Sequence, residues 1–193
     1  QYADYTLFVA EVASTVNENL LIEHLLAEKN QDPATRLALL NQYLENFKGT
    51  VYRQTMFAEF ERELGRMAER GETLTADALD EKYLALNRLY FGPDMVSDAQ
   101  IALEWARIPH FYYNYYVFQY ATGFSAAVAL ADRILREGEP AVADYKCFLS
   151  GGSSTDPISL LKLAGVDMST PAPVDAALAM FGELVDELDA LTR

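Results

Sequence analysis

Two glutamates on one predicted helix are the first residues whose type and spacing could do chemistry. Glu11 and Glu18 lie seven residues apart in a stretch, residues 4–29, that is otherwise rich in Val, Ala and Leu. Helical periodicity places them about 20° apart around the helix and about 10 Å apart along its axis. Glutamate is rarely buried unless it is paired or binds a metal ion. The pair therefore indicates either such a site or a narrow solvent-exposed strip shared with Ser14 and Thr15.

An aromatic run, "HFYYNYYVFQY" at residues 110–120, is the second chemical signal. Helical spacing puts three of its tyrosines in one stripe, namely Tyr113, Tyr116 and Tyr120. His110 lies at the edge of that stripe. Phenols beside a histidine can donate hydrogen bonds to a substrate carbonyl or to a developing oxyanion. The same rings can also serve only as core, with their hydroxyls reaching water.

The remaining reactive side chains give weaker signals. His24 lies outside the face of Glu11 and Glu18 and is expected to be a structural or surface histidine. Cys147 has no activating base nearby in the sequence, so no catalytic role is expected for it. A catalytic zinc ion needs three protein ligands, and two histidines and one cysteine make a complete zinc site from this chain doubtful.

The sequence pattern along the chain is mainly that of helices, with apolar residues at helical spacing and capping residues at the predicted ends. A first helix is predicted from about residue 6 to 29, and it is expected to be buried because apolar residues surround it. Sustained strand alternation is absent from the sequence. The pattern predicts an all-α fold of about seven or eight helices forming a single unit over residues 1–193. Predicted boundaries are caps at Asp32, Thr75 and Asp156, prolines at Pro33, Pro109 and Pro157, a weak point or break at Gly49, an end at Gly71, and a helix-ending glycine turn at 150–154.

Composition narrows the class of protein. The chain has 193 residues, a net charge of −14 and 51% hydrophobic residues, so it is long enough and apolar enough to form a core. Such acidity argues against binding to nucleic acid or to anionic membranes. One cysteine excludes an intrachain disulfide, and no signal peptide or membrane-spanning run is recognisable. We therefore expect a soluble cytoplasmic protein.

Three segments together closely resemble the C-terminal part of one enzyme family. They are "YADYTLFVAEVASTVNENLL", "RIPHFYYNYYVFQYATGFSAAVALADRIL" and "FLSGGSSTDPISLLKLAGVDMSTPAPVDAAL". The family is that of the oligoendopeptidase F enzymes, which are thimet-oligopeptidase-like zinc metallopeptidases. The resemblance covers nearly the whole chain. It implies a multi-helix C-terminal lobe of a zincin-type (neurolysin- or thimet-like) catalytic domain, and a zinc metalloendopeptidase that cleaves short oligopeptides.

The resemblance also assigns roles to individual residues. It implies that Glu11 is the third zinc ligand and that Glu18 orients a ligand from the outer shell, so both are expected to be buried. His110 and the tyrosines after it match a segment that binds the peptide and stabilises the oxyanion. More than one register of the aromatic run fits that segment. The stripe argument favours Tyr113 and Tyr116.

The chain departs from the family in one respect, because it contains no H-E-x-x-H segment. That segment supplies the other two zinc ligands and the general base in the family. The chain begins at Gln1 rather than Met, and we expect it to be a C-terminal piece of a longer protein. Alone, it is predicted to be inactive and to bind zinc weakly or not at all, and its expected partners are the missing N-terminal part and an oligopeptide. The alternative is a non-catalytic helical peptide-binding module without a metal site.

Overall fold

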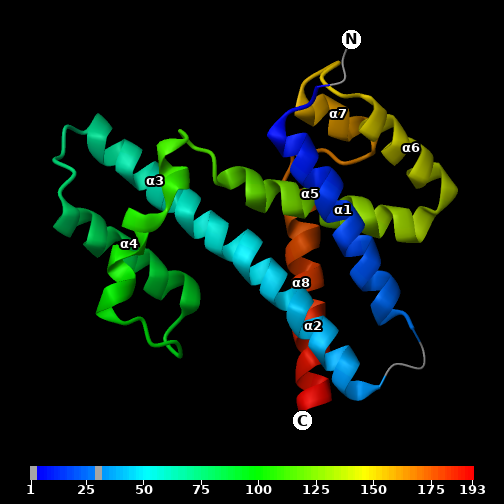
Figure 1. The fold of residues 1–193 in the computed structure, drawn as a ribbon, viewed down its shortest axis with the longest axis horizontal. Helices are drawn as coiled ribbons and strands as arrows, with labels where there is room; N and C mark the ends of the chain where they lie inside the picture. Colours follow the sequence, from blue (N-terminus) through cyan, green and yellow to red (C-terminus); the bar gives the residue numbers. More distant parts are fainter. Residues whose placement is uncertain (1–3, 29–31) are drawn as a thin grey trace. The chain divides into compact units, whose positions relative to one another are not determined.

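A computed structural model describes residues 4–28 and 32–193, and every regular element within these ranges is helical (Figure 1). The predicted all-α fold is confirmed. Contacts between Cα atoms group the chain into two compact units: Gln1–Val51 with Thr122–Arg193 forms the first, and Tyr52–Ala121 forms the second. The expectation that residues 1–193 act as a single part of a catalytic domain stays a prediction.

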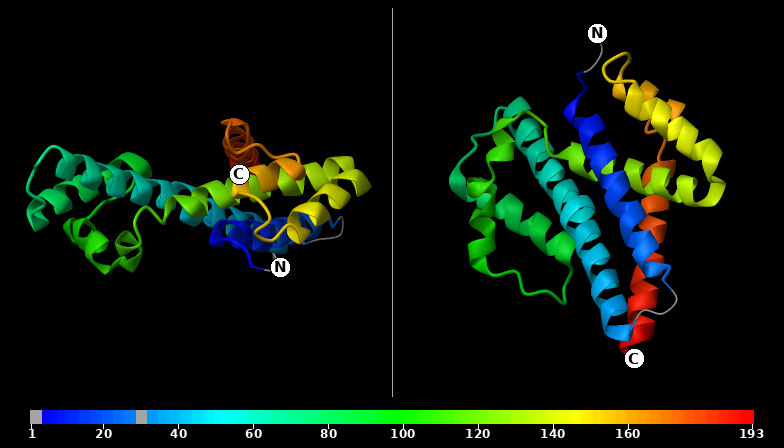
Figure 2. Two further views of the ribbon diagram at one scale, coloured as in Figure 1. Left: turned by 90° about the horizontal axis from the view of Figure 1, so that it is seen from above. Right: turned by 45° about the vertical axis from the view of Figure 1, so that its right-hand side comes forward.

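The first unit is built mainly from long helices. Leu40 and Phe47 of α2 are fully buried, and α2 packs against both α1 and α8 (Figure 2). Arg36 of α2 donates from Nε to Oε1 of Glu187 on α8 at 2.7 Å. The helices of this unit are α1 (Leu7–Leu26), α2 (Pro33–Phe47), α5 (Phe118–Glu137) from Thr122 onward, α6 (Glu139–Ser150), α7 (Pro157–Leu163) and α8 (Ala172–Thr192).

Helix starts lie where the capping residues predicted them. Asp32 accepts from the backbone N–H of Thr35 at 3.1 Å, and Asp156 accepts from that of Ser159 at 2.9 Å. Thr75 caps α4 in the second unit by accepting from the N–H of Ala78 at 3.3 Å. These side chains satisfy N–H groups that have no partner inside the helix, which explains why local sequence is sufficient to locate these boundaries.

Helix α1 is less buried than its apolar composition predicted. Val12 and Val16 are fully buried in the core of the first unit. On the opposite side, Leu21 is 59% exposed and Leu7 is also exposed. The prediction of a buried helix is therefore wrong for one of its faces, since the described helices of the first unit cover one side of α1 and leave Leu7 and Leu21 exposed.

Gly49 lies in a short π-helix, η1 (Lys48–Tyr52), which follows α2 and precedes α3. The sequence predicted that this glycine would split or weaken a long helix. Glycine destabilises an α-helix interior by about 1 kcal/mol relative to alanine. The predicted interruption at Gly49 is therefore a single wider π-helical turn between α2 and α3.

The second unit packs aromatic rings between two helices and a pair of 3₁₀ helices. Phe60 and Tyr83 are fully buried and meet edge to face, with ring centroids 5.3 Å apart. Met56, Phe57, Leu79 and Val117 complete the core. Its helices are α3 (Arg53–Glu69), α4 (Ala76–Phe91), η2 (Ala99–Arg107), η3 (Pro109–Tyr112) and the first residues of α5.

A buried carboxylate joins three helices of the second unit. Glu104 of η2 is 8% exposed and accepts from the hydroxyl of Tyr83 on α4 at 2.5 Å. It also forms ion pairs with Arg53 of α3 and Arg107. Burial acts to raise the pKa of Glu104, but the Tyr83 hydrogen bond and the two guanidinium groups lower it below its ordinary value. The carboxylate therefore stays charged and crosslinks the unit.

The neighbouring Trp105 adds a further link from η2 to α4, because its indole Nε1 donates to Oδ1 of Asp80 at 2.7 Å. The ring is half-buried against the core of the same unit.

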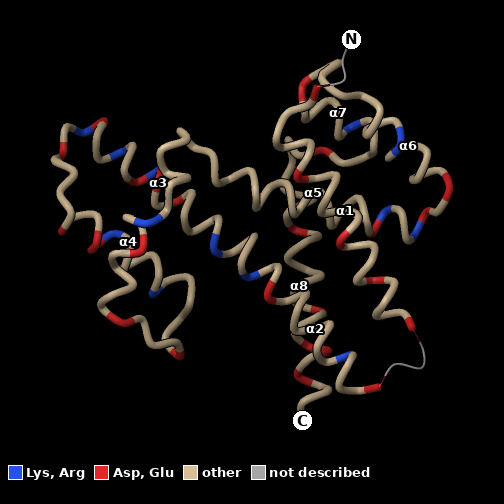
Figure 3. Tube along the Cα trace, in the orientation of Figure 1, with Lys and Arg blue, Asp and Glu red and all other residues tan. Residues whose placement is uncertain are grey.

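Acidic residues occur on helices throughout the described chain (Figure 3). The sequence holds 29 acidic and 15 basic residues, so acidic residues outnumber basic ones about two to one. Among the helices of the described residues, none combines the length and the apolar character that a bilayer crossing requires.

Candidate functional site

The aromatic run does not form the long helix predicted from Pro109. That prediction is wrong: η3 ends at Tyr112, and α5 begins only at Phe118. Between them the chain turns through residues 113–117, which we name the aromatic turn. The helix is interrupted because Asn114 and Tyr115 have φ angles of 50° and 57°, in the left-handed region.

The turn nevertheless brings together the histidine and the tyrosines that the predicted stripe contained. The imidazole of His110 stacks on the ring of Tyr116, with centroids 5.6 Å apart and planes 22° from parallel. The ring centroids of Tyr113 and Tyr120 lie 6.1 Å and 6.2 Å from that of His110, and both rings are nearly perpendicular to the imidazole. The Oη atoms of Tyr116 and Tyr120 lie 3.0 Å apart. These four residues form one aromatic cluster, and their catalytic role stays a prediction.

The cluster offers hydrogen-bond donors to an incoming ligand. Tyr113 is 63% exposed, whereas His110 and Tyr116 are half-buried. When Tyr120 donates to Tyr116, the hydrogen of Tyr116 stays available for a second acceptor, such as a carbonyl oxygen. Tyr120 belongs to the predicted stripe but is not among the predicted site residues. Its spacing of four residues from Tyr116 was the signal that could have added it.

Glu11 lies in the first unit, on α1, beside α5. It is half-buried, and a Cβ added at Gly123 of α5 would lie 3.7 Å from its Cβ. Within residues 4–28 and 32–193 its carboxylate has no hydrogen-bond or ion-pair partner. A half-buried carboxylate without a partner is suited to accept a ligand or a cation.

Glu18 is exposed, so the prediction that it is buried is wrong for this chain. Seven-residue spacing places it on the same face as Glu11, but Gly123 of α5 lies beside Phe8, Glu11 and Val12, in the first two turns of α1. Ser14, between the two glutamates, is exposed as well. Of the two interpretations of this face, the solvent-exposed strip therefore fits its end at Glu18 in this chain.

The described residues contain no group of three or more His, Cys, Asp or Glu side chains placed to hold a metal ion. The donor chemistry of Glu11 fits one carboxylate ligand of zinc, which accepts carboxylate oxygen alongside imidazole and thiolate. A complete ligand set does not lie within the part of the chain that the structure describes.

The weaker candidates lie as expected. His24 and Cys147 are both exposed on the first unit. Helix α6 ends at Ser150, immediately before the glycine pair, which confirms that the glycine segment is a helix-ending turn.

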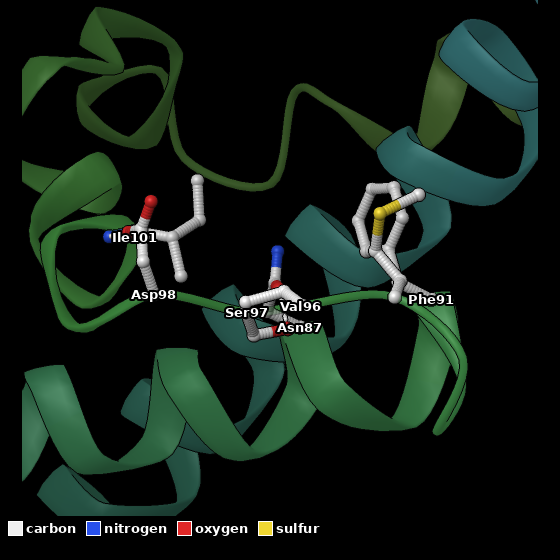
Figure 4. A pocket seen from close by; sticks show the side chains of 7 residues that line it. Asn87, Phe91, Val96, Ser97, Asp98 and Ile101 are labelled. Carbon is white, nitrogen blue, oxygen red and sulfur yellow. Dashed lines mark hydrogen bonds between the residues drawn. The ribbon is translucent and has the colours of Figure 1, made fainter.

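A small hollow in the second unit lies between the end of α4 and the start of η2 (Figure 4). Ser97 donates to Oδ1 of Asn87 across it at 2.7 Å. Phe91, Met95, Val96, Asp98 and Ile101 form the rest of its lining. None of the predicted site residues lies there. The amide oxygen of Asn87 already accepts a hydrogen bond from Ser97, so the hollow offers few free polar groups to a ligand.

The sequence pattern of peptidase family M3 matches residues 1–180. The chain belongs to peptidase family M3. This assignment confirms the resemblance to oligoendopeptidases on which the predicted roles of the glutamates and the aromatic cluster depend.

Individual M3 relatives are similar over nearly the whole chain. Oligopeptidase PepF of Bacillus subtilis is 57% identical over 190 residues, 98% of this chain and 28% of its own length. The chromosomal oligoendopeptidase F of Lactococcus lactis subsp. cremoris is 45% identical over 192 residues, 100% of this chain and 32% of its own length. The chain thus spans about a third of the length of these M3 peptidases.

A solved M3 structure has the same fold. The crystal structure of oligoendopeptidase-F from Enterococcus faecium superposes with a TM-score of 0.92 at 50% identity, covering 97% of this chain and 36% of that one. The helical arrangement described above is therefore that of a region of an oligoendopeptidase.

Proposed function

We propose that the protein to which this chain belongs is a zinc metalloendopeptidase that hydrolyses short oligopeptides. In this proposal the chain contributes one zinc ligand and the residues that bind the peptide and its oxyanion. Membership of peptidase family M3, with relatives named oligopeptidase and oligoendopeptidase, supports the peptidase class. The unpartnered carboxylate of Glu11 is the observation that supports its place in the site.

Glu11 would hold the metal through its carboxylate. When bound, zinc supplies a Lewis acid and lowers the pKa of water to about 7. The half-buried position of Glu11 shields part of its side chain from water, and Gly123 of α5 lies directly beside it. The other ligands would come from outside the described residues.

Glu18 would act through another ligand rather than on the metal itself. Its carboxylate would accept an N–H from a ligating side chain, which fixes the orientation of that ligand. The exposure of Glu18 in this chain leaves both of its oxygens accessible for that contact.

The aromatic cluster would bind the substrate backbone and the developing oxyanion. Donors that already point at the place where negative charge develops stabilise a transition state without reorganisation. Stacking between His110 and Tyr116 fixes both side chains in position, and the exposed phenol of Tyr113 lies beside them.

The test uses the complete gene product and its Glu11→Gln variant. We expect the variant to lose zinc measured by metal analysis after dialysis, and to lose hydrolysis of a quenched fluorescent oligopeptide, because a neutral amide replaces an anionic ligand. Glu18→Gln should weaken zinc affinity about 10- to 100-fold, the usual effect of losing an outer-shell partner. Full metal content and activity in Glu11→Gln would contradict the role of Glu11.

Glu28→Gln serves as the matched control, since Glu28 is exposed just beyond the end of α1. It should keep both zinc and activity. Binding of the peptide by the wild-type protein without any turnover would instead support the non-catalytic binding module.

A further inference from the structure

The aromatic turn holds two consecutive residues in a backbone conformation that residues other than glycine rarely adopt. Asn114 and Tyr115 have φ angles of 50° and 57°. Asparagine tolerates this region better than most residues, whereas for tyrosine it is an outlier. Such strain persists only where surrounding contacts over-determine the conformation, and these positions concentrate at functional sites.

One contact that holds the turn comes from Glu61 on α3. Its Oε1 accepts from the backbone N–H of Tyr115 at 2.6 Å, which is short and charge-assisted. Glu61 is 8% exposed, and its Oε2 is buried with no hydrogen-bond partner within the described residues. Burial raises the pKa of this carboxyl, although the Tyr115 hydrogen bond acts to lower it. An incompletely satisfied buried carboxyl is costly, so a packing role alone does not explain it.

A second contact comes from Gly65, one helical turn after Glu61. The hydroxyl end of Tyr115 lies so close to Gly65 that a Cβ there would clash with it. The missing side chain opens a notch on α3 that receives the phenol. Backbone and side chain of the same left-handed tyrosine are therefore both fixed by one face of α3.

We infer that Glu61 and Gly65 are positioning residues, which hold the aromatic turn in the shape that groups His110 with Tyr113 and Tyr116. The inference rests on the proposed function, because it gives the cluster its use in catalysis. It adds two residues of α3 that touch neither peptide nor metal in the proposal.

The experiment uses the complete gene product and measures two quantities, hydrogen exchange at the Tyr115 amide and kcat for a quenched oligopeptide. Glu61→Ala should speed exchange at that amide by about 10-fold or more, as expected for one lost hydrogen bond to a charged acceptor. It should also lower kcat by about 10- to 100-fold, the usual cost of a misplaced site. Glu61→Gln should restore both values toward wild type, because its amide oxygen can accept the same N–H.

Gly65→Ala provides a second variant whose folding is not at risk, since alanine favours the helix more than glycine. It should displace the phenol of Tyr115, lower kcat, and leave the thermal unfolding temperature unchanged or higher. Glu69→Ala is the matched control, because Glu69 is an exposed glutamate of the same helix. It should leave exchange and kcat unchanged.

The inference is overturned if exchange at Tyr115 in Glu61→Ala stays within about twofold of wild type, or if Glu61→Gln restores exchange but not kcat. It is also overturned if Gly65→Ala leaves kcat at the wild-type value. His110→Ala and Tyr116→Phe are measured alongside. Normal turnover in both would refute the proposed role of the cluster, while the exchange data would still decide whether Glu61 holds the turn.

Discussion

Tyr116 and Tyr120 share a hydrogen bond between their hydroxyl oxygens, at 3.0 Å, on either side of the start of α5. The imidazole of His110 contacts both rings. One phenol must donate to the other. Deleting a single hydroxyl therefore breaks this hydrogen bond and also changes which hydroxyl hydrogens the cluster can offer to a ligand.

Tyr113→Phe and Tyr116→Phe separate a catalytic role of these phenols from a packing role, because each keeps the ring and removes only the hydroxyl. We expect at least one of them to lower kcat by about 10²-fold or more in the complete gene product, with zinc content unchanged. Stability should change by no more than about 1 kcal/mol. Steady-state kinetics with metal analysis checks this.

His110→Ala completes that series and should also lower turnover, with a larger effect on KM if the imidazole mainly binds the peptide backbone. Unchanged kinetics in all three variants would mean that the cluster serves only as packing.

Glu104 should make the stability of the chain sensitive to acid. Its folded-state pKa lies below its ordinary value of 4.5, so its stabilisation is fully present above about pH 4.5 and is lost as the pH falls through the folded value. Glu104→Gln should lower the free energy of unfolding at pH 7 by about 1.5–3 kcal/mol, the worth of a hydrogen bond to a charged group. The variant should also show a shallower decline below pH 4.5.

Denaturant unfolding followed by circular dichroism between pH 3 and pH 7 measures this difference. Glu81→Gln is the control, since Glu81 is exposed on α4. A parallel acid decline in wild type and Glu104→Gln would show that the ion pairs of Glu104 do not govern the acid response.

The 193-residue chain by itself should bind zinc weakly or not at all and should not hydrolyse peptides. Only one of the three ligands that the family resemblance implies, Glu11, is present in its sequence, and three are needed for a catalytic zinc ion. Metal analysis after dialysis and an assay with a quenched peptide test this. Stoichiometric zinc together with turnover would refute it.

Boundaries set by local chemistry were predictable from sequence. Asp32, Thr75 and Asp156 each cap a helix by accepting from an N–H two or three residues away, so the interacting groups lie within one short segment. The all-α class follows from the same local signals, repeated along the chain.

The aromatic turn was not predictable in this way, because its shape depends on a partner far away in sequence. Helical spacing treats residues 110–120 as continuous, whereas the contact between Glu61 and Tyr115 joins residues 54 positions apart. Glu61 was the available signal, since it lies at helical spacing from Phe57 and Leu64, and a buried acidic residue needs a partner.

The exposure of Glu18 was missed for a related reason. A helical wheel establishes which residues share a face, but it does not show how far a neighbouring helix extends along that face. Gly123 of α5 lies against α1 at Glu11, which is half-buried, whereas Glu18 is exposed. Two residues with the same angular position therefore differ in burial.

Trp105, which bonds to Asp80 within the second unit, is the only tryptophan in the chain. Its fluorescence emission therefore reports on Tyr52–Ala121 alone, while far-ultraviolet circular dichroism follows the helices of both units. Transition midpoints that coincide for the two signals would indicate that the units unfold together, and midpoints that differ would indicate that they unfold independently. The chain passes from the first unit to the second and back again. The position of this single indole thus supplies an intrinsic optical probe of whether the two units unfold cooperatively.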